Sequence, residues 1–402
     1  MKVAVWINKS MDPKLGGGFS YTSKLLQLID DKQFNFKLEI CFIGSEAISF
    51  RLNKPYFHVD LTAKKLSILN QFIVSFSRKF RILKGLKNKI QSNHRSSYIE
   101  RIHKRLKENQ IDIIYYLAPM ELYVPKFPFI STNWDLGHLT LPPFPEITEE
   151  NELAVRTKWY DKTLLSAKYV FVESEAGKKE LVELLSYPKE KIKVVPIFPG
   201  NLVNLKVSLE QQKVILQKFN IEKNNFFMYP AQFWKHKNHE RLISAFAKVS
   251  KDNIKLKLIL NGSDKGELEN VLKFIDSIGI SDQVNYVGFL SNEELFTLYK
   301  NASALVFPSL LGPTNMPPLE ARAIGCPVLC SDFVGHKEQL GDGALYFNPE
   351  NEDEIAKSMM AMLDERERKA LQEKATAEFN NSKFKGNIAV SKIEEHLLAI
   401  SI

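Results

Sequence analysis

The chain has 402 residues and a mass of 46.1 kDa, enough for two or three domains of ordinary size. Hydrophobic residues make up 44% and charged residues 25% of it, a balance that excludes disordered chains and membrane channels. No run approaches the ~18 consecutive apolar residues of a membrane-spanning helix, and no secretion signal opens the sequence, so we expect a cytoplasmic protein. Three cysteines, Cys41, Cys326 and Cys330, are too few for a disulfide framework, and we expect them to be small buried side chains.

Short β-branched or aromatic runs alternate with amphipathic stretches along the whole chain, which is typical of βα units that build a parallel sheet. The first half contains strand-like runs at residues 3–7, 38–43, 113–116, 129–133, 169–172 and 192–197. The second half contains them at residues 226–230, 256–261, 284–287, 304–307 and 328–330. The pattern therefore predicts one α/β domain in each half.

The clearest break in the chain lies at Pro196, Pro199 and Gly200, which precede a polar stretch. We predict an N-terminal domain over residues 1–204 and a C-terminal domain over residues 205–381. The expected fold class is α/β, with two doubly wound Rossmann-like domains that face each other across a cleft. Because parallel sheets bind ligands at the carboxyl ends of their strands, the cleft is the expected site.

Gly16, Gly17 and Gly18 follow the first predicted strand and precede an amphipathic run. Glycines allow the backbone to approach a ligand closely, and a helix N-terminus attracts an anion. We therefore expect this loop to bind phosphates. Three glycines also occur in ordinary surface loops, and their spacing is not the dinucleotide pattern G-x-G-x-x-G.

A strongly basic segment spans residues 78–107, with eleven lysines and arginines and one acidic residue, Glu100. Because the net charge of the chain is +8, the rest of the chain is slightly acidic. Basic side chains interleaved with apolar ones suit peripheral contact with anionic lipid headgroups. A solvated helix face is the equal alternative, and the absence of a nucleic-acid-binding motif argues against nucleic acid as a partner.

Asp135 and His138 follow the strand predicted at residues 129–133 and are expected to point toward the cleft. We consider them catalytic candidates that orient the acceptor or the donor. A lone Asp or His at a strand end also serves as a helix cap or turn residue, which is the alternative.

The loop at residues 229–239 follows the first strand of the second domain and carries Gln232, Lys235 and Lys237. A lysine at the edge of the cleft can neutralise a pyrophosphate as a point charge. We therefore expect Lys237 to bind phosphate, with Lys235 beside it. The alternative is an exposed basic loop without a ligand.

Another loop, residues 307–321, leads into a predicted helix that opens with Pro317 and Pro318. The backbone amides from Asn315 to Leu319 would then form an anion site at the helix N-terminus, with Thr314, Asn315 and Met316 as nucleotide-binding residues. Glu320 lies one turn further, where a carboxylate can accept hydrogen bonds from both hydroxyls of a ribose. Favourable placement in the helix dipole is the simpler explanation for this glutamate.

This segment, continuing to Gln339, resembles the donor-nucleotide motif of retaining family 4 glycosyltransferases, which have the two-domain GT-B fold. The glycine loop and residues 134–138, 172–177, 230–234 and 288–291 follow in the family's order and spacing. The resemblance implies that Lys237 contacts the donor diphosphate and that Glu320 holds the ribose. It also implies that the glycine loop closes over the phosphates and that the last helix, residues 382–402, packs back on the first domain.

Three positions depart from the family pattern. Gly312 stands where the family has the first of two glutamates, Gln232 replaces a phosphate-binding arginine, and Trp134 replaces a histidine. A branch of bacterial surface-polysaccharide enzymes is similar in these substitutions. We therefore interpret them as features of a subfamily.

The resemblance implies retaining transfer of a hexose from a nucleoside-diphosphate sugar to a polysaccharide or lipid-linked acceptor, at the inner face of the cytoplasmic membrane. GDP-mannose is the favoured donor and a UDP-linked hexose the alternative. No Asp-x-Asp motif lies at a suitable strand end, so we expect no metal ion and no other cofactor. The rival functions are a sugar-nucleotide epimerase, whose carboxylate-rich cleft the sequence does not indicate, and a catalytically silent binding scaffold.

Overall fold

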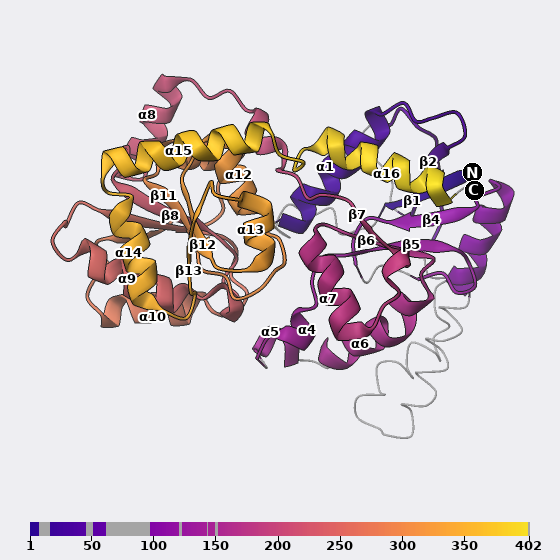
Figure 1. Ribbon diagram of the computed structural model, residues 1–402, viewed down its shortest axis with the longest axis horizontal. Helices are drawn as coiled ribbons and strands as arrows, with labels where there is room; N and C mark the ends of the chain where they lie inside the picture. The colour runs from indigo at the N-terminus through magenta and orange to yellow at the C-terminus, as the bar shows by residue number, and fades with distance from the viewer. Residues whose placement is uncertain are drawn as a thin grey trace, which may run out of the picture.

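The computed structural model describes residues 1–7, 17–45, 51–61, 97–119, 123–142, 144–148 and 152–400. Within these residues the strands form two parallel sheets, one of seven strands and one of six, each flanked by helices (Figure 1). The predicted α/β fold with two doubly wound domains is confirmed.

The first sheet has the order β3-β2-β1-β4-β5-β6-β7. Its strands are β1 (Lys2–Ile7), β2 (Glu39–Gly44), β3 (Tyr56–His58), β4 (Ile113–Tyr116), β5 (Phe129–Asn133), β6 (Tyr169–Val172) and β7 (Ile192–Val194). Its helices are α1 (Gly17–Asp31), α4 (Gly137–Thr140), α5 (Pro145–Thr148), α6 (Glu152–Lys158) and α7 (Glu175–Leu185), with the short turns η3 (Trp159–Thr163), η4 (Leu164–Ser166) and η5 (Lys189–Lys191). Residues 97–108 are also helical.

The second sheet has the order β10-β9-β8-β11-β12-β13. Its strands are β8 (Phe226–Pro230), β9 (Lys257–Asn261), β10 (Val284–Tyr286), β11 (Ala304–Phe307), β12 (Val328–Ser331) and β13 (Leu345–Phe347). The helices of this half are η6 (Asn201–Asn204), α8 (Leu209–Lys218), η7 (Lys235–Lys237), α9 (His239–Ser250), α10 (Leu268–Ser277), α11 (Asn292–Asn301), α12 (Met316–Ile324), α13 (Val334–Leu340), α14 (Glu352–Ala361), α15 (Glu365–Asn380) and α16 (Gly386–Ile400).

Both faces of each sheet are covered by helices, which is why the strands read as unbroken apolar runs instead of alternating with polar residues. In β1, Val3, Val5 and Ile7 enter one hydrophobic cluster, while Ala4 and Trp6 enter the cluster on the opposite face. Every residue of β5, β11 and β12 is buried. This burial holds the strand ends, and the loops that follow them, in fixed positions.

Local sequence fixes several helix starts. Ser291 caps α11, with its hydroxyl accepting from the Glu294 amide while the Glu294 carboxylate accepts from the Ser291 amide. Ser174 caps α7 by accepting from the Gly177 amide. The β6–α7 connection is therefore short and rigid at the point where it meets the second domain.

The chain crosses between the domains twice. It passes once through η6, and it returns from α15 to α16, which packs on α1 (Figure 1). The apolar face of α16 lies in a hydrophobic cluster of the first domain, and Nε2 of His396 is 3.0 Å from the carbonyl oxygen of Val194. Met316 and Leu319 of α12 enter the same cluster from the second domain.

Candidate functional site

A cleft of about 650 Å³ lies between the two domains and is lined by residues of both. The loops after β5, β6, β8 and β11 border it, so the carboxyl ends of both parallel sheets converge there. Lys237 and Glu320 both line this cleft. The shared hollow that the sequence interpretation requires is therefore present.

The cleft brings together most of the candidates from the sequence. Those that line it are Gly18, Asp135, Gln232, Lys237, Thr314, Asn315, Met316 and Glu320. Gly17 is the first residue of α1. Gly16 lies outside the described residues, so phosphate binding by the whole glycine loop stays a prediction.

His138 is buried and does not line the cleft. Its ring stacks on Tyr160 with the ring centroids 4.4 Å apart, and its Nδ1 has no hydrogen-bond partner among the described residues. Burial and the nearby Arg156 lower the pKa of His138, so the ring is neutral at pH 7. His138 therefore packs behind the wall of the cleft, and of the two catalytic candidates that follow β5 only Asp135 lines the cleft.

Lys237 is the last residue of η7, which Tyr229 anchors by donating a 2.8 Å hydrogen bond to its carbonyl oxygen. The Lys237 ammonium donates to Oγ of Ser309 at 3.3 Å and lies over the ring of Phe307. Burial lowers the pKa of Lys237 to about 8, although Asp135 and Glu146 oppose the shift. A bound anion would restore the full charge, because it compensates for the lost solvation.

Lys235 is not part of the cleft lining. Its ammonium pairs with Glu240 at 2.9 Å and with Glu267 at 3.3 Å, and the hydrogen bond to Glu240 is the main reason that its pKa is raised. The prediction that both lysines face a phosphate is therefore wrong for Lys235. Its charge is neutralised within the second domain.

Glu320 lies one turn into α12 and is buried. Its carboxylate accepts from the hydroxyl of Tyr299 at 3.5 Å and from the backbone amide of Gly200 in the interdomain crossing. A Cβ atom at Gly200 would come within 2.9 Å of Oε1 of Glu320, so a side chain there would displace this carboxylate. Burial raises the pKa of Glu320 to about 7, against the effect of these two hydrogen bonds.

The N-terminus of α12 offers fewer free amides than the sequence suggested. The Asn315 amide donates to Oε1 of Gln339 at 3.2 Å, and Pro317 and Pro318 have no N–H group. The predicted row of amides from Asn315 to Leu319 is therefore wrong. What this helix offers an anion is chiefly its dipole.

Among the described residues, four carboxylates line the cleft: Asp135, Glu146, Glu173 and Glu320. The expectation that the cleft would lack a carboxylate-rich pattern is therefore wrong. Glu146 and Glu173 were not among the sequence candidates. Two signals could have found Glu173, because it directly follows a predicted strand and lies within residues 172–177, which carry the family resemblance.

Several of these side chains connect the two domains. Oε1 of Glu146 accepts from the backbone amide of His236 at 3.0 Å and lies 2.7 Å from Nδ1 of the same residue. Burial alone would raise the pKa of Glu146, but the hydrogen bonds from His236 lower it below its usual value. Outside the cleft lining, the carboxylate of Glu338 in α13 accepts hydrogen bonds from the backbone amides of Glu175 and Ala176 at the start of α7.

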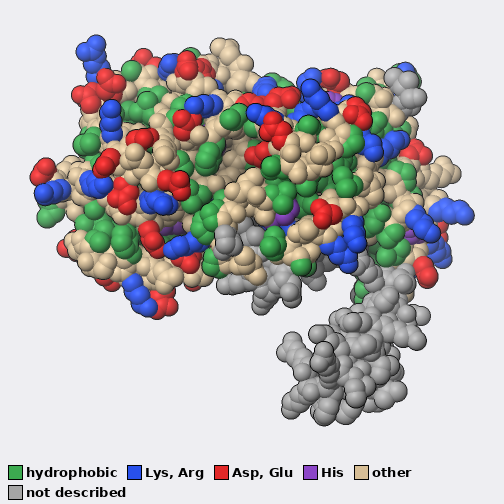
Figure 2. Space-filling view, turned by 60° about the horizontal axis from the view of Figure 1, so that its bottom comes forward, with side chains coloured by type: hydrophobic (Ala, Val, Ile, Leu, Met, Phe, Trp, Pro, Cys, Tyr) green, Lys and Arg blue, Asp and Glu red, His purple; other side chains and the backbone are tan. Residues whose placement is uncertain are grey.

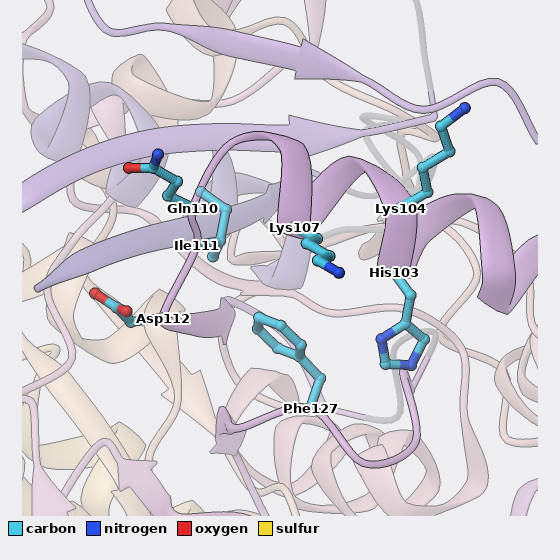
Figure 3. Close-up of a pocket in the computed structure, with 7 residues that line it drawn as sticks. All are labelled: His103, Lys104, Lys107, Gln110, Ile111, Asp112 and Phe127. Atoms are coloured by element: carbon cyan, nitrogen blue, oxygen red, sulfur yellow. The ribbon is translucent and has the colours of Figure 1, made fainter.

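A second hollow, of about 540 Å³, lies on the first domain beside the helical residues 97–108 (Figure 3). Its polar lining includes His103, Lys104 and Lys107. This helix is the described end of the basic segment, whose residues 78–96 lie outside the described part of the chain. Over the face drawn in Figure 2, described side chains of both charges are intermixed. Contact of the basic segment with anionic lipid stays a prediction.

Within the described ranges, no helix is long and apolar enough to cross a bilayer. No group of three His, Cys, Asp or Glu side chains among the same residues is arranged to hold a metal ion. The three cysteines are buried and unpaired by disulfides, as expected.

Residues 211–378 match the family model described as glycosyl transferases group 1. This match covers most of the second domain. The fold of the whole chain agrees with solved GT-B structures. It aligns over 99% of its length with Anabaena Alr3699/HepE in complex with UDP and glucose, at a TM-score of 0.70 and 17% identity, covering 100% of that chain. It aligns with WaaG, a glycosyltransferase involved in lipopolysaccharide biosynthesis, at 0.69 and 13% identity, over 97% and 98% of the two chains.

The chain also resembles curated proteins of bacterial glycan synthesis. It is 24% identical over 237 residues to O-antigen chain mannosyltransferase B of Escherichia coli, covering 59% of this chain and 61% of the relative. It is 32% identical over 185 residues to O-antigen chain mannosyltransferase RfbU of Salmonella typhimurium, covering 46% and 48%. These matches span between half and three fifths of the relatives' lengths. The resemblance to glycosyltransferases of bacterial surface polysaccharides is confirmed.

Glu320→Gln in the ligand-free protein is expected to change how stability depends on pH. Folding raises the pKa of Glu320 from about 4.5 to about 7, so between these pH values the native protein binds a proton that the unfolded chain has lost. This proton stabilises the native state at low pH, and the stabilisation disappears as the pH rises through this range. Glutamine does not titrate, so the unfolding free energy of the variant minus that of the native protein should rise over this window by on the order of 2 kcal/mol. Denaturant titrations at pH 5, 6, 7 and 8 measure it, and a flat or falling difference contradicts the expected burial.

Proposed function

We propose that this protein is a retaining hexosyltransferase of surface-glycan synthesis. It moves a hexose, with mannose from GDP-mannose favoured, to a polysaccharide or lipid-linked acceptor at the inner face of the cytoplasmic membrane. The observation that carries the proposal is the meeting of Lys237 and Glu320 in one cleft at the carboxyl ends of two parallel sheets. The mannosyltransferase names of the curated relatives favour the sugar.

The chemistry required of the cleft is stabilisation of a leaving group. Breaking the bond between the anomeric carbon and the diphosphate leaves negative charge on the diphosphate and positive charge on the sugar. The Lys237 ammonium and the dipole of α12 are the groups that stabilise the diphosphate, and Glu320 fixes the nucleoside through its ribose. The acceptor hydroxyl replaces the diphosphate on the anomeric carbon and loses its proton. We propose that this requires no divalent cation.

The decisive experiment incubates the purified protein with GDP-mannose or UDP-glucose, an oligosaccharide or polyprenyl-diphosphate acceptor, and either Mg²⁺ or excess EDTA. We expect a glycosylated product with the anomeric configuration of the donor, formed at the same rate with EDTA. A product that needs Mg²⁺ overturns the metal-independent part, and an inverted product overturns retention.

An arm with donor alone tests the rival that the four cleft carboxylates favour, a sugar-nucleotide epimerase. We expect the sugar to remain unchanged without an acceptor, as followed by NMR of the anomeric proton. A new sugar nucleotide in this arm would establish epimerisation. Donor binding without product from any acceptor would establish a silent scaffold.

A further inference from the structure

Glu173 is a cleft carboxylate to which no role has been assigned above. It directly follows β6 and precedes the capped start of α7, so a rigid connection holds it at the carboxyl end of the first sheet. The side chain is 8% exposed and lines the cleft. Its position is therefore fixed by the first domain, while its oxygens face the space between the domains.

One oxygen of this carboxylate is bound by the second domain. The hydroxyl of Thr314 donates to Oε2 of Glu173 at 2.6 Å. Among the described residues, no other hydrogen-bond donor contacts the Glu173 side chain. Burial raises the pKa of Glu173 to about 7, although the hydrogen bond from Thr314 opposes the shift. With one oxygen bound to Thr314, the carboxyl group still retains acceptor positions for hydroxyl groups of a ligand.

The second-domain loop that contains Thr314 supplies no side-chain acceptor at Gly312. Gly312 lines the cleft at φ +119°, and a Cβ atom there would lie 2.7 Å from Nδ2 of Asn315 and 2.8 Å from the carbonyl oxygen of Thr314. No side chain fits at this position of the loop. The carboxylate of the first domain reaches the same loop from across the cleft.

The loop after β11 places Glu173 on the diphosphate side of the cleft. Within this loop Ser309 accepts from the Lys237 ammonium, and Thr314 donates to Glu173. Glu320 is bound instead by Tyr299 and Gly200. In a nucleotide sugar the hexose extends from the diphosphate away from the nucleoside, so the carboxylate that contacts the same loop as Lys237 is the one that faces the hexose.

We propose that Glu173 binds the donor hexose by accepting hydrogen bonds from the hydroxyl groups of the sugar. The first domain thereby supplies a side-chain contact that Gly312, in the second domain, does not provide. This rests on the proposed function. A neutral polyol suits this position better than a second phosphate, because the carboxylates of Asp135 and Glu173 repel a further anion. The Thr314 hydroxyl orients the carboxylate.

The test measures how strongly the hexose contributes to binding. Equilibrium dissociation constants of GDP and GDP-mannose, and of UDP and UDP-glucose, are determined by calorimetry for the native protein and for Glu173→Gln. The amide keeps the shape and an acceptor for Thr314 but loses the charge. Glu338→Gln is the matched control, because it makes the same change at an interdomain carboxylate outside the cleft lining.

Glu173→Gln is expected to raise the dissociation constant of the nucleotide sugar about tenfold relative to that of its nucleoside diphosphate. Glu338→Gln is expected to leave this ratio unchanged. If Glu173→Gln leaves the ratio of the two dissociation constants unchanged, including the case in which both ligands lose affinity equally, the inference is overturned. Binding of the nucleotide sugar by the native protein would still support the proposed function. Failure of the native protein to bind either nucleotide sugar overturns both.

Discussion

Replacing Lys237 with Met is expected to lower the rate of glycosyl transfer by about 10²- to 10³-fold while the protein remains folded. The ammonium is held by Ser309 over the ring of Phe307 and faces the cleft. Removing one preorganised charge from a developing anion typically costs this much, because water cannot replace it in a closed site. Methionine keeps most of the side-chain volume, so the loss reports on charge.

The loop itself provides the control. Lys235→Met removes a lysine two residues away whose ammonium is committed to Glu240 and Glu267. Turnover should stay within about threefold, since an exposed ion pair contributes little. Initial rates with saturating acceptor measure both variants. Equal losses in the two would show that the basic loop acts by general charge, and near-normal turnover in Lys237→Met would remove this residue from the mechanism.

Glu320→Gln is expected to weaken nucleoside diphosphate binding about tenfold or more. A carboxylate can accept from both ribose hydroxyls, whereas an amide presents one acceptor and a donor that finds no partner there. Gln is close in size to Glu, so the close approach to Gly200 is retained. Calorimetry with GDP and UDP measures the loss.

The ribose contact itself can be isolated with 2′-deoxy-GDP. The native protein should bind it less tightly than GDP, and Glu320→Gln should bind the two nucleotides almost equally, because the partner of the missing hydroxyl is already gone. A constant preference for GDP in both proteins would mean that Glu320 acts on helix stability alone. Tyr299→Phe serves as the control, since it removes a hydrogen bond to Glu320 without touching the ribose.

The strands could be predicted from the sequence because they are buried on both faces. Runs such as β5 and β11 agree with the structure at both ends, since every residue in them is apolar or fully covered. The sequence did not reveal β3 and β13, which have three residues each and partly exposed side chains.

The site was less predictable than the fold. Residues that follow second-domain strands, such as Lys237 and Glu320, could be placed in the cleft from the motif alone. The contacts of Lys235 with Glu267 and of Glu173 with Thr314 depend on how loops far apart in the chain meet. The spacing of residues in the sequence does not indicate which distant loops come into contact. Lys235 was therefore predicted to lie in the site, and Glu173 was omitted from it.

The double crossing of the chain, through η6 and again between α15 and α16, limits how the two halves can move. Two covalent tethers define a line, and rotation about that line is the one large motion that stretches neither of them. Substrate entry is therefore a hinged opening with a fixed axis, in contrast to the free swivelling that a single linker would allow. The apolar side chains of α16 belong to the hydrophobic cluster of the first half. Deleting α16 would therefore remove the second tether between the halves and would also expose an apolar surface of the first half.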